Sequence, residues 1–144
     1  MDLRTILLVE DNQDDELLTL DALRNGGVAN PVTVVRDGAE ALDYLFAQGS
    51  FAGRDASRQP CVILLDLKLP RIGGLEVLRR IKTDDRTRRI PAVVLTTSSE
   101  HEDIHDCYDN GANSYVRKPV EFDGFLKAVR QLGMYWTLVN ERTL

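Results

Sequence analysis

The sequence has few of the residues that build thiol or imidazole metal sites, disulfide frameworks or membrane anchors. Its 144 residues include two cysteines, Cys61 and Cys107, and two histidines. Two cysteines that each sit inside a predicted core element fit neither a metal cluster nor a disulfide framework, which favours a reducing compartment. No apolar run approaches the ~18–20 residues of a membrane span, and the first residues lack a signal-peptide pattern. We therefore expect a soluble, cytoplasmic protein with no membrane partner.

Positive charge is also scarce relative to negative charge. The chain has 18 Lys and Arg residues against 23 Asp and Glu residues, for a formal net charge of −5 at pH 7. A general nucleic-acid binder needs a basic surface that releases counterions from the polyanion, so we expect no nucleic-acid partner. The length suits one compact core and is short for two domains, which predicts a single domain over residues 1–144.

Five short apolar runs alternate with helical stretches along the chain. The runs span residues 5–9, 32–35, 61–65, 92–96 and 114–116. The first and third runs are continuously apolar rather than alternating, which is typical of strands buried on both faces of a parallel sheet. The alternation of strands and helices therefore predicts an α/β fold, a doubly wound five-stranded parallel sheet with five helices.

Local signals mark the ends of two helices and one long connection. The segment 37–40, Asp-Gly-Ala-Glu, matches a capping box at the start of the second helix. Gly26 and Gly27 are expected to end the first helix. The polar segment 49–60 is expected to be a long loop, because the next strand begins directly after it.

The last helix is expected to be the longest, from about residue 121 to residue 140. At ~1.5 Å per residue it would span about 30 Å, whereas a five-residue strand spans about 17 Å, so the helix should overrun the sheet. Some apolar residues fall off its core stripe within the overrun, namely Met134, Tyr135 and Leu138. They are either scattered exposed side chains or a surface for a partner.

Polar side chains gather where the predicted strands end. They are Glu10 and Asp11 after the first strand, Asp66 at the third, Thr96 and Thr97 at the fourth, and Lys118 after the fifth. The carboxyl ends of parallel strands meet at one edge, where ligands bind in open α/β sheets. Three carboxylates brought together there would repel one another, so a cation must balance them. Oxygen ligands with open coordination places favour Mg²⁺.

This arrangement suits the transfer of a phosphoryl group to a carboxylate beside Mg²⁺. Asp66 is the best candidate for the nucleophile, and Glu10 and Asp11 would hold the metal. Lys118 would pair with the carboxylate or the bound phosphoryl group, and Thr96 would donate its hydroxyl to a phosphoryl oxygen. An aspartate at the end of a single strand is usually a turn residue or a helix cap. Five polar residues placed at the same edge of the sheet favour a shared site instead.

The same residues resemble a CheY-like receiver domain of two-component response regulators, over essentially the whole chain. The resemblance rests on Val9-Glu10-Asp11, Leu64-Leu65-Asp66 with Pro70 and Gly74, Leu95-Thr96, Gly111-Ala112 before Tyr115, and Lys118-Pro119. It implies a flavodoxin-like strand order 2-1-3-4-5 and Mg²⁺-dependent transfer of a phosphoryl group from a sensor histidine kinase to Asp66. It also implies a metal ligand in the backbone carbonyl of Lys68, a switch formed by Thr96 and Tyr115, and a cis bond before Pro119.

A narrower resemblance points to the single-domain regulators that serve phytochrome-type kinases, which tend to dimerise. It rests on the loop 49–60, on Thr97 and on the extended C-terminal helix with Tyr135-Trp136. It implies a stand-alone response regulator with a phytochrome-type sensor kinase as partner. It further implies a homodimer through the fourth helix, fifth strand, fifth helix and C-terminal extension. Such a protein is a phosphoacceptor that signals by contacts, not an enzyme that turns over a substrate.

Three alternatives remain beside this interpretation. The segment 101–105 matches the zinc-protease motif HExxH, but its histidines lie off the helix side formed by Ile104, Cys107 and Gly111, and a third histidine is missing. An aspartate-nucleophile phosphatase would need a carboxylic acid where Lys68 stands. A degenerate receiver that binds partners without phosphorylation is disfavoured by the intact acidic set.

Two charged segments have an ordinary explanation as well as a functional one. Basic residues crowd the third helix and the loop after it, as a solvated face or as a docking surface for an acidic partner. They are Arg71, Arg79, Arg80, Lys82, Arg86, Arg88 and Arg89. The acidic residues Asp14, Asp15 and Glu16 are expected only to favour the start of the first helix.

Overall fold

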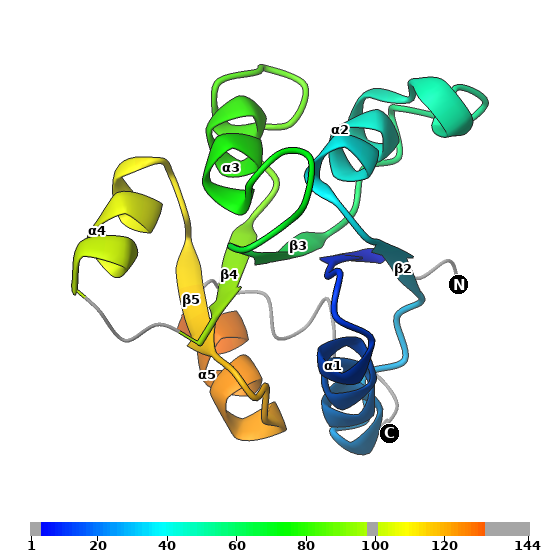
Figure 1. Cartoon of the computed structure of the whole chain (residues 1–144). Helices are drawn as coiled ribbons and strands as arrows, with labels where there is room; N and C mark the ends of the chain where they lie inside the picture. Colours follow the sequence, from blue (N-terminus) through cyan, green and yellow to red (C-terminus); the bar gives the residue numbers. More distant parts are fainter. Residues whose placement is uncertain (1–3, 98–100, 132–144) are drawn as a thin grey trace.

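Five strands and five helices alternate along the chain in a computed structural model that describes residues 4–97 and 101–131 (Figure 1). The strands are β1 (Ile6–Val9), β2 (Val32–Val35), β3 (Val62–Asp66), β4 (Ala92–Thr96) and β5 (Ser114–Arg117). The helices are α1 (Gln13–Asn25), α2 (Gly38–Phe46), α3 (Gly74–Lys82), α4 (His101–Asp109) and α5 (Phe122–Gln131), with a 3₁₀ turn η1 (Gly49–Phe51) after α2.

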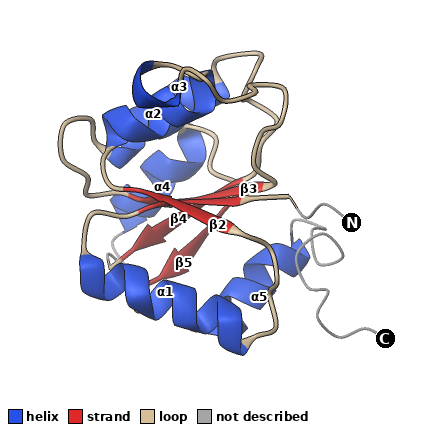
Figure 2. Ribbon diagram, turned by 90° about the vertical axis from the view of Figure 1, so that its right-hand side faces the viewer, coloured by secondary structure: helices blue, strands red, loops and turns tan. Residues whose placement is uncertain are grey.

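The strands form one sheet in the order β2-β1-β3-β4-β5, and every neighbouring pair is parallel. Helices α2, α3 and α4 cover one face of the sheet, and α1 and α5 cover the other (Figure 2). The predicted fold class and strand order are therefore confirmed. Among the described residues, no helix combines the length and the apolar character needed to cross a membrane.

The apolar core is divided by the sheet into two halves. Leu7 and Ile63 pack into the half that contains side chains of α2, α3 and α4, whereas Leu8 and Leu64 pack into the half that contains α1 and α5. All four side chains are fully buried. Since successive residues of β1 and β3 point to opposite, equally apolar layers, the uninterrupted apolar runs in the sequence follow directly.

The two cysteines lie in different halves of this core. Cys61 belongs to the half with α1 and α5, and Cys107 to the half with α2, α3 and α4. Both are free thiols and both are buried. Burial raises the pKa of each thiol above its ordinary value, because a thiolate would lose its hydration. They act as small core residues.

The helix ends follow the local signals with one difference. Asp37 caps α2, and its side chain accepts a hydrogen bond from the Glu40 backbone N–H at 2.7 Å. The Glu40 carboxylate accepts from the backbone N–H of Arg36 at 2.7 Å, one residue before the position that a capping box requires. Helix α1 ends at Asn25 with Gly26 as its C-cap, and Gly27 has a φ of 81°, a conformation that glycine adopts without strain.

The loop 49–60 is anchored by one arginine. The guanidinium of Arg54 donates to the backbone carbonyl oxygens of Tyr44 at 2.7 Å and Arg58 at 2.9 Å, and to the side-chain oxygen of Gln59 at 2.7 Å. It also stacks 4.1 Å from the centre of the Tyr44 ring. The loop is therefore held to the end of α2 by contacts that the polar composition alone did not indicate.

The C-terminal helix is described only in part. Helix α5 is described as far as Gln131, and its Phe125 is buried against the sheet as expected. The predicted extension to residue 140 lies outside the described residues, as do Met134, Tyr135, Trp136 and Leu138.

Gly74, at the start of α3, lies very close to the backbone at the end of β3 and just after it. A Cβ atom on Gly74 would meet the Asp66 carbonyl oxygen at 2.2 Å and the Cα of Leu67 at 2.7 Å, and both are backbone atoms. We expect Gly74→Ala to lower the free energy of unfolding in urea by about 2 kcal/mol, because overpacking against backbone typically costs ~1–3 kcal/mol.

Gly73→Ala is the matched control, because a Cβ there meets nothing within 4 Å and its φ of −67° suits any residue. This control should lose less than about 1 kcal/mol, which reflects the preference for glycine over alanine at an N-cap. Equal losses in the two variants would contradict the close packing at Gly74.

Candidate functional site

The carboxyl ends of four strands bring the predicted polar residues to one edge of the sheet. Val9 of β1 is paired with Leu65 of β3, so Glu10 and Asp66 follow side by side. The register continues across the sheet, where Asp66 pairs with Leu95 of β4 and Thr96 pairs with Arg117 of β5. Lys118 comes next in the chain. Residues more than a hundred positions apart therefore share this edge because the parallel register is fixed.

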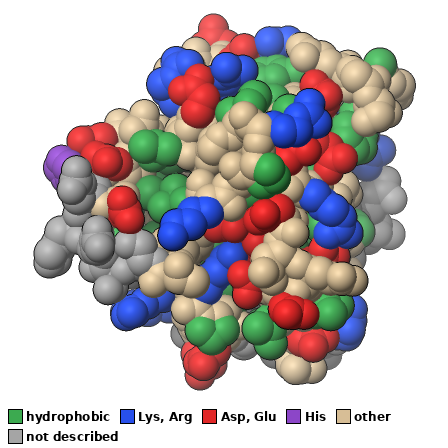
Figure 3. Space-filling model, in the orientation of Figure 1, with side chains coloured by type: hydrophobic (Ala, Val, Ile, Leu, Met, Phe, Trp, Pro, Cys, Tyr) green, Lys and Arg blue, Asp and Glu red, His purple; other side chains and the backbone are tan. Residues whose placement is uncertain are grey.

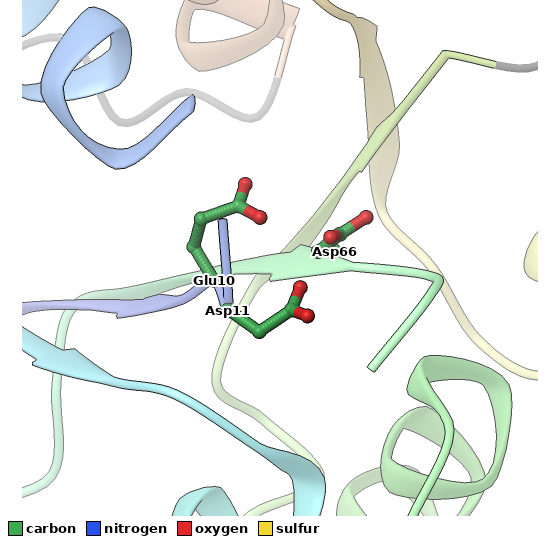
Figure 4. A group of neighbouring side chains, drawn as sticks. All are labelled: Glu10, Asp11 and Asp66. Atoms are coloured by element: carbon green, nitrogen blue, oxygen red, sulfur yellow. The ribbon is translucent and has the colours of Figure 1, made fainter. Parts of the chain in front are cut away.

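Three carboxylates meet at this edge. Glu10, Asp11 and Asp66 each offer one oxygen atom, and these atoms all lie within 4.8 Å of one another (Figure 4). Glu10 is fully buried and Asp66 is 7% exposed, while Asp11 is exposed. The structure thus contains the acidic group that the sequence predicted. The exposure of its side chains increases from Glu10 through Asp66 to Asp11.

The ammonium of Lys118 lies among the carboxylates. Its Nζ is 2.7 Å from Oε1 of Glu10, 3.2 Å from Oδ2 of Asp66 and 3.0 Å from Oδ2 of Asp15. The Lys118 side chain is 6% exposed, so these charges interact where water screens them poorly. Sequence reasoning did not place Asp15 here. The sequence carried one signal for this position of Asp15: α1 begins only a few residues after β1, so the first turn of α1 lies near the end of that strand.

Burial dominates the electrostatics of Glu10. Its pKa is raised from 4.5 to about 7, chiefly because burial removes the hydration of the carboxylate. The Lys118 ammonium lowers the pKa and the neighbouring Asp66 carboxylate raises it, and the value of about 7 includes both effects. Burial lowers the pKa of Lys118, but its close contacts with the Glu10 and Asp15 carboxylates and the charge of Asp66 more than offset this, so the net direction is upward. The lysine is therefore charged, and the carboxylates compete for it.

This donor set fits a divalent cation. The carboxylates of Glu10, Asp15 and Asp66 contact one ammonium, and Asp11 lies beside Glu10 and Asp66, so negative charge is in excess. The buried Oε1 of Glu10, although close to Lys118, receives no hydrogen bond of good geometry. An oxygen-only group with an unsatisfied buried oxygen is suited to a hard cation such as Mg²⁺, Mn²⁺ or Ca²⁺.

A cavity of about 260 Å³ opens beside the acidic group. Asp66 and Lys118 line it together with Thr96, Thr97 and Lys68, and the last two are exposed at its rim. The backbone N–H of Lys68 donates to Oδ1 of Asp66 at 3.3 Å, which orients that carboxylate. A small anionic group can therefore reach Asp66 from solvent.

Two further predicted residues are placed by the structure. The peptide bond between Lys118 and Pro119 is cis. Tyr115 lies outside the acidic group, on β5, with 36% of its surface exposed. Its ring makes an edge contact with Tyr108 of α4, with ring centres 6.2 Å apart. It borders a second cavity, of about 410 Å³, between β5 and α5.

The rival zinc motif does not assemble a metal site among the described side chains. His105 is exposed, and its Nε2 lies 3.1 Å from the Asp109 carboxylate on the same helix. The side chain of His101 lies outside the described residues. The group of metal-ligating side chains found in the described part of the chain is the acidic one at the sheet edge.

The basic residues around α3 are mostly engaged within the chain. On the face shown in Figure 3, Lys and Arg side chains are interspersed with Asp and Glu. Ion pairs join Arg79 and Arg80 to Glu76, Arg86 to Asp84, Arg88 to Asp85 and Arg71 to Asp37. These contacts favour the interpretation as a solvated face over a docking surface for an acidic partner.

The raised pKa of Glu10 predicts a stability that falls as the pH rises. Between its ordinary pKa of 4.5 and its folded pKa of about 7, the folded state holds a proton that the unfolded state has released. The free energy of unfolding without divalent cations should then decline through this window, by at most about 1.4 kcal/mol per pH unit. Glu10→Gln cannot ionise and should flatten the decline in urea titrations. Equal slopes in the two proteins would refute this assignment.

Comparison with known proteins gives consistent matches over most of the chain. A sequence profile of the response regulator receiver domain matches residues 6–130. The probable methanogenesis regulatory protein FilR2 of Methanothrix harundinacea is 42% identical over 131 residues, which cover 91% of this chain and 82% of that protein. Response regulator Rcp1 of Synechocystis sp. is 36% identical over 133 residues, which cover 92% of this chain and 88% of that protein.

Solved structures agree with the sequence matches. The bacteriophytochrome response regulator AtBRR has a TM-score of 0.88 and 52% identity, covering 98% of this chain and 100% of that chain. The Mn²⁺-bound form of Rcp1 has a TM-score of 0.76 and 35% identity, covering 98% of each chain. Phosphorylation-dependent signalling is the general function of these proteins, whose receivers take phosphoryl groups from histidine kinases. The chain belongs to the response regulator receiver domain family.

Proposed function

We propose that this chain accepts a phosphoryl group on Asp66 from a sensor histidine kinase, with Mg²⁺ as the cofactor. The observation that carries the proposal is the meeting of the Glu10, Asp11 and Asp66 oxygens within 4.8 Å of one another, beside the ammonium of Lys118. A carboxylate nucleophile between a metal ion and an ammonium suits phosphoryl transfer, because both cations offset charge on the transferring oxygens.

Asp66 is the carboxylate best placed to act as nucleophile. Glu10 is fully buried, and Asp11 is exposed. Asp66 lies between these extremes: it lines the cavity, and its two oxygens are oriented by the Lys68 N–H and by Lys118. One of these oxygens would form the bond to phosphorus as the bond from phosphorus to the kinase histidine breaks. The product is an aspartyl phosphate, and the histidine nitrogen takes back the electron pair.

Three neighbours would support this step. Mg²⁺ held by Glu10, Asp11, Asp66 and the backbone carbonyl of Lys68 would offset the charge of the phosphoryl oxygens. Lys118 would pair with one phosphoryl oxygen through its ammonium. Thr96, which lines the same cavity at the end of β4, would donate its hydroxyl to another. The preference for Mg²⁺ is supported by an oxygen-only donor set of few protein ligands, which leaves places for water and phosphate.

Incubation with acetyl phosphate and intact-mass measurement tests this proposal. We expect one phosphate adduct per chain in the presence of Mg²⁺, little without a divalent cation, and none in Asp66→Asn. Asp11→Asn removes a metal ligand and should reduce the adduct strongly, whereas Asp14→Asn, an exposed residue of α1, is the matched control. An adduct that persists in Asp66→Asn would overturn the assignment.

Turnover of a small phosphate ester separates a receiver from a phosphatase. A receiver accepts one phosphoryl group on Asp66 and hydrolyses it only by its own slow reaction. A phosphatase of the aspartate-nucleophile type would turn over a small phosphate ester repeatedly. Lys68 stands where such an enzyme needs a carboxylic acid, and this lysine is exposed at the rim of the cavity. Sustained phosphate release from a simple ester would therefore favour the phosphatase.

We further propose that the chain is one receiver domain over residues 1–144 and signals by contacts with other proteins. Thr96 would move toward the phosphoryl group, and Tyr115 would turn inward. The exposed Tyr115 ring beside Tyr108 and the cavity of about 410 Å³ support this, because rotation of the ring would reshape the α4-β5-α5 surface. The likeness to the bacteriophytochrome response regulator AtBRR supports a phytochrome-type kinase as partner. We also propose a homodimer through this surface and the C-terminal extension, to which the exposed Tyr115 ring would contribute.

Sedimentation velocity with and without beryllofluoride tests the dimer. We expect a homodimer that Tyr115→Asp weakens at least about tenfold, because a buried unpaired charge at an interface is costly. Leu17→Asp places the same charge on α1, at a residue 53% exposed and outside the proposed surface, and should leave the dimer intact. A monomer at high concentration in both conditions would eliminate the dimer.

A further inference from the structure

Asp15 is connected to the site through Lys118. Its Oδ2 accepts a hydrogen bond from Nζ of Lys118 at 3.0 Å, a contact that joins residues 103 positions apart. The Asp15 side chain is 32% exposed and lines the same cavity as Asp66. One explanation for Asp15 is its place in the first turn of α1, because a negative charge is favourable at a helix N-terminus. That explanation does not account for the contact with Lys118.

The contact closes a ring of polar interactions. Oε2 of Glu10 accepts from the backbone N–H of Asn12 at 3.3 Å, and the side-chain oxygen of Asn12 accepts from the backbone N–H of Asp15 at 2.9 Å. Asp15 accepts from Lys118, whose Nζ lies 2.7 Å from Oε1 of Glu10. The ring ties together the end of β1, the start of α1 and the residue after β5. The position of Asp15 is therefore fixed by its own backbone as well as by its side chain.

Asp15 differs from the other two carboxylates that contact Lys118. Glu10 and Asp66 both belong to the acidic group that can hold a cation, whereas Asp15 does not. A bound cation would offset the negative charge of Glu10 and Asp66. Phosphorylation would convert the Asp66 carboxylate into an acyl phosphate. Asp15 lies outside the acidic group and takes part in neither change. A lysine has a flexible stem and a compact ammonium, so its position depends on the acceptors that remain.

We infer that Asp15 is a positioning residue, which holds the Lys118 ammonium beside Asp66 so that it pairs with the incoming phosphoryl group. The inference rests on the proposed function and adds to it a residue of α1. Asp15 acts on the orientation of Lys118, and Lys118 is the residue that contacts the phosphoryl group.

The position of Lys118 can be measured without any phosphorylation. In protein labelled with ¹⁵N-lysine, an ammonium held by several acceptors exchanges its hydrogens slowly enough to give an Nζ signal, and Lys118→Arg identifies it. We expect the Lys118 signal in the wild-type protein and in Asp14→Asn, and its loss in Asp15→Asn. Asp14→Asn removes the same charge from the same helical turn. A signal that survives in Asp15→Asn would overturn the inference.

Beryllofluoride binding measured with Mg²⁺ separates positioning from simple charge. If Asp15 positions Lys118, Asp15→Asn should bind beryllofluoride about tenfold more weakly, because a charge-assisted contact is lost. If Asp15 only adds negative charge to the cavity, the same variant should bind the anion more tightly. Asp14→Asn should stay within about twofold of wild type, and Asp15→Glu should regain part of the loss.

A double-mutant cycle identifies the route of the effect. In a Lys118→Ala background, Asp15→Asn should change beryllofluoride affinity no further, because its partner is gone. An undiminished effect in that background would overturn the inference. Failure of wild-type protein to bind beryllofluoride or to take phosphate would instead remove the proposed function, while the Nζ signal would still decide whether Asp15 holds Lys118.

Discussion

Carboxylates gathered around one ammonium repel one another at the carboxyl edge of the sheet. Glu10 is buried where an ionised carboxylate is poorly hydrated, and Asp66 lies beside it. Lys118 can offset only part of the negative charge. The energy of the sheet edge is therefore sensitive to any added cation, proton or phosphoryl group. Such sensitivity is what a receiver needs, because a change of charge at one point must alter the molecule.

The sheet makes this crowding possible. Repulsion would drive the carboxylates apart if their backbones could move, but β1, β3 and β4 are buried on both faces and paired in a fixed parallel register. A slip by one residue would exchange the two layers of side chains and is resisted by the whole core. The energy that packs Leu7, Leu8 and their neighbours into two apolar layers thus also holds unfavourable charges in place.

The sequence predicted the fold and the acidic group for the same reason. Continuous apolar runs specify strands buried on both faces, and residues just after such strands must meet at one edge. Contacts that depend on the reach of long side chains were not predictable in this way. Asp15 meets Lys118 only because α1 starts so close to β1 and because the lysine stem extends back across the site.

The arginine anchor of the long loop was missed for a related reason. Spacing along the chain does not reveal that the Arg54 guanidinium reaches carbonyl oxygens of α2 and of its own loop. The predicted extension of α5 lies outside the described residues.

The Arg54 anchor has a consequence for how this protein can diverge. Arg54 donates to backbone carbonyl oxygens, which every amino acid carries, as well as to the Gln59 side chain, so the exposed side chains of Ala52 and Ala56 have little part in shaping the loop. The loop lies before β3, at the amino end of the strands, whereas the acidic group follows their carboxyl ends. The surface of the loop can therefore change during evolution and acquire new binding specificities, while the chemistry of the acidic group at the opposite end of the strands stays the same.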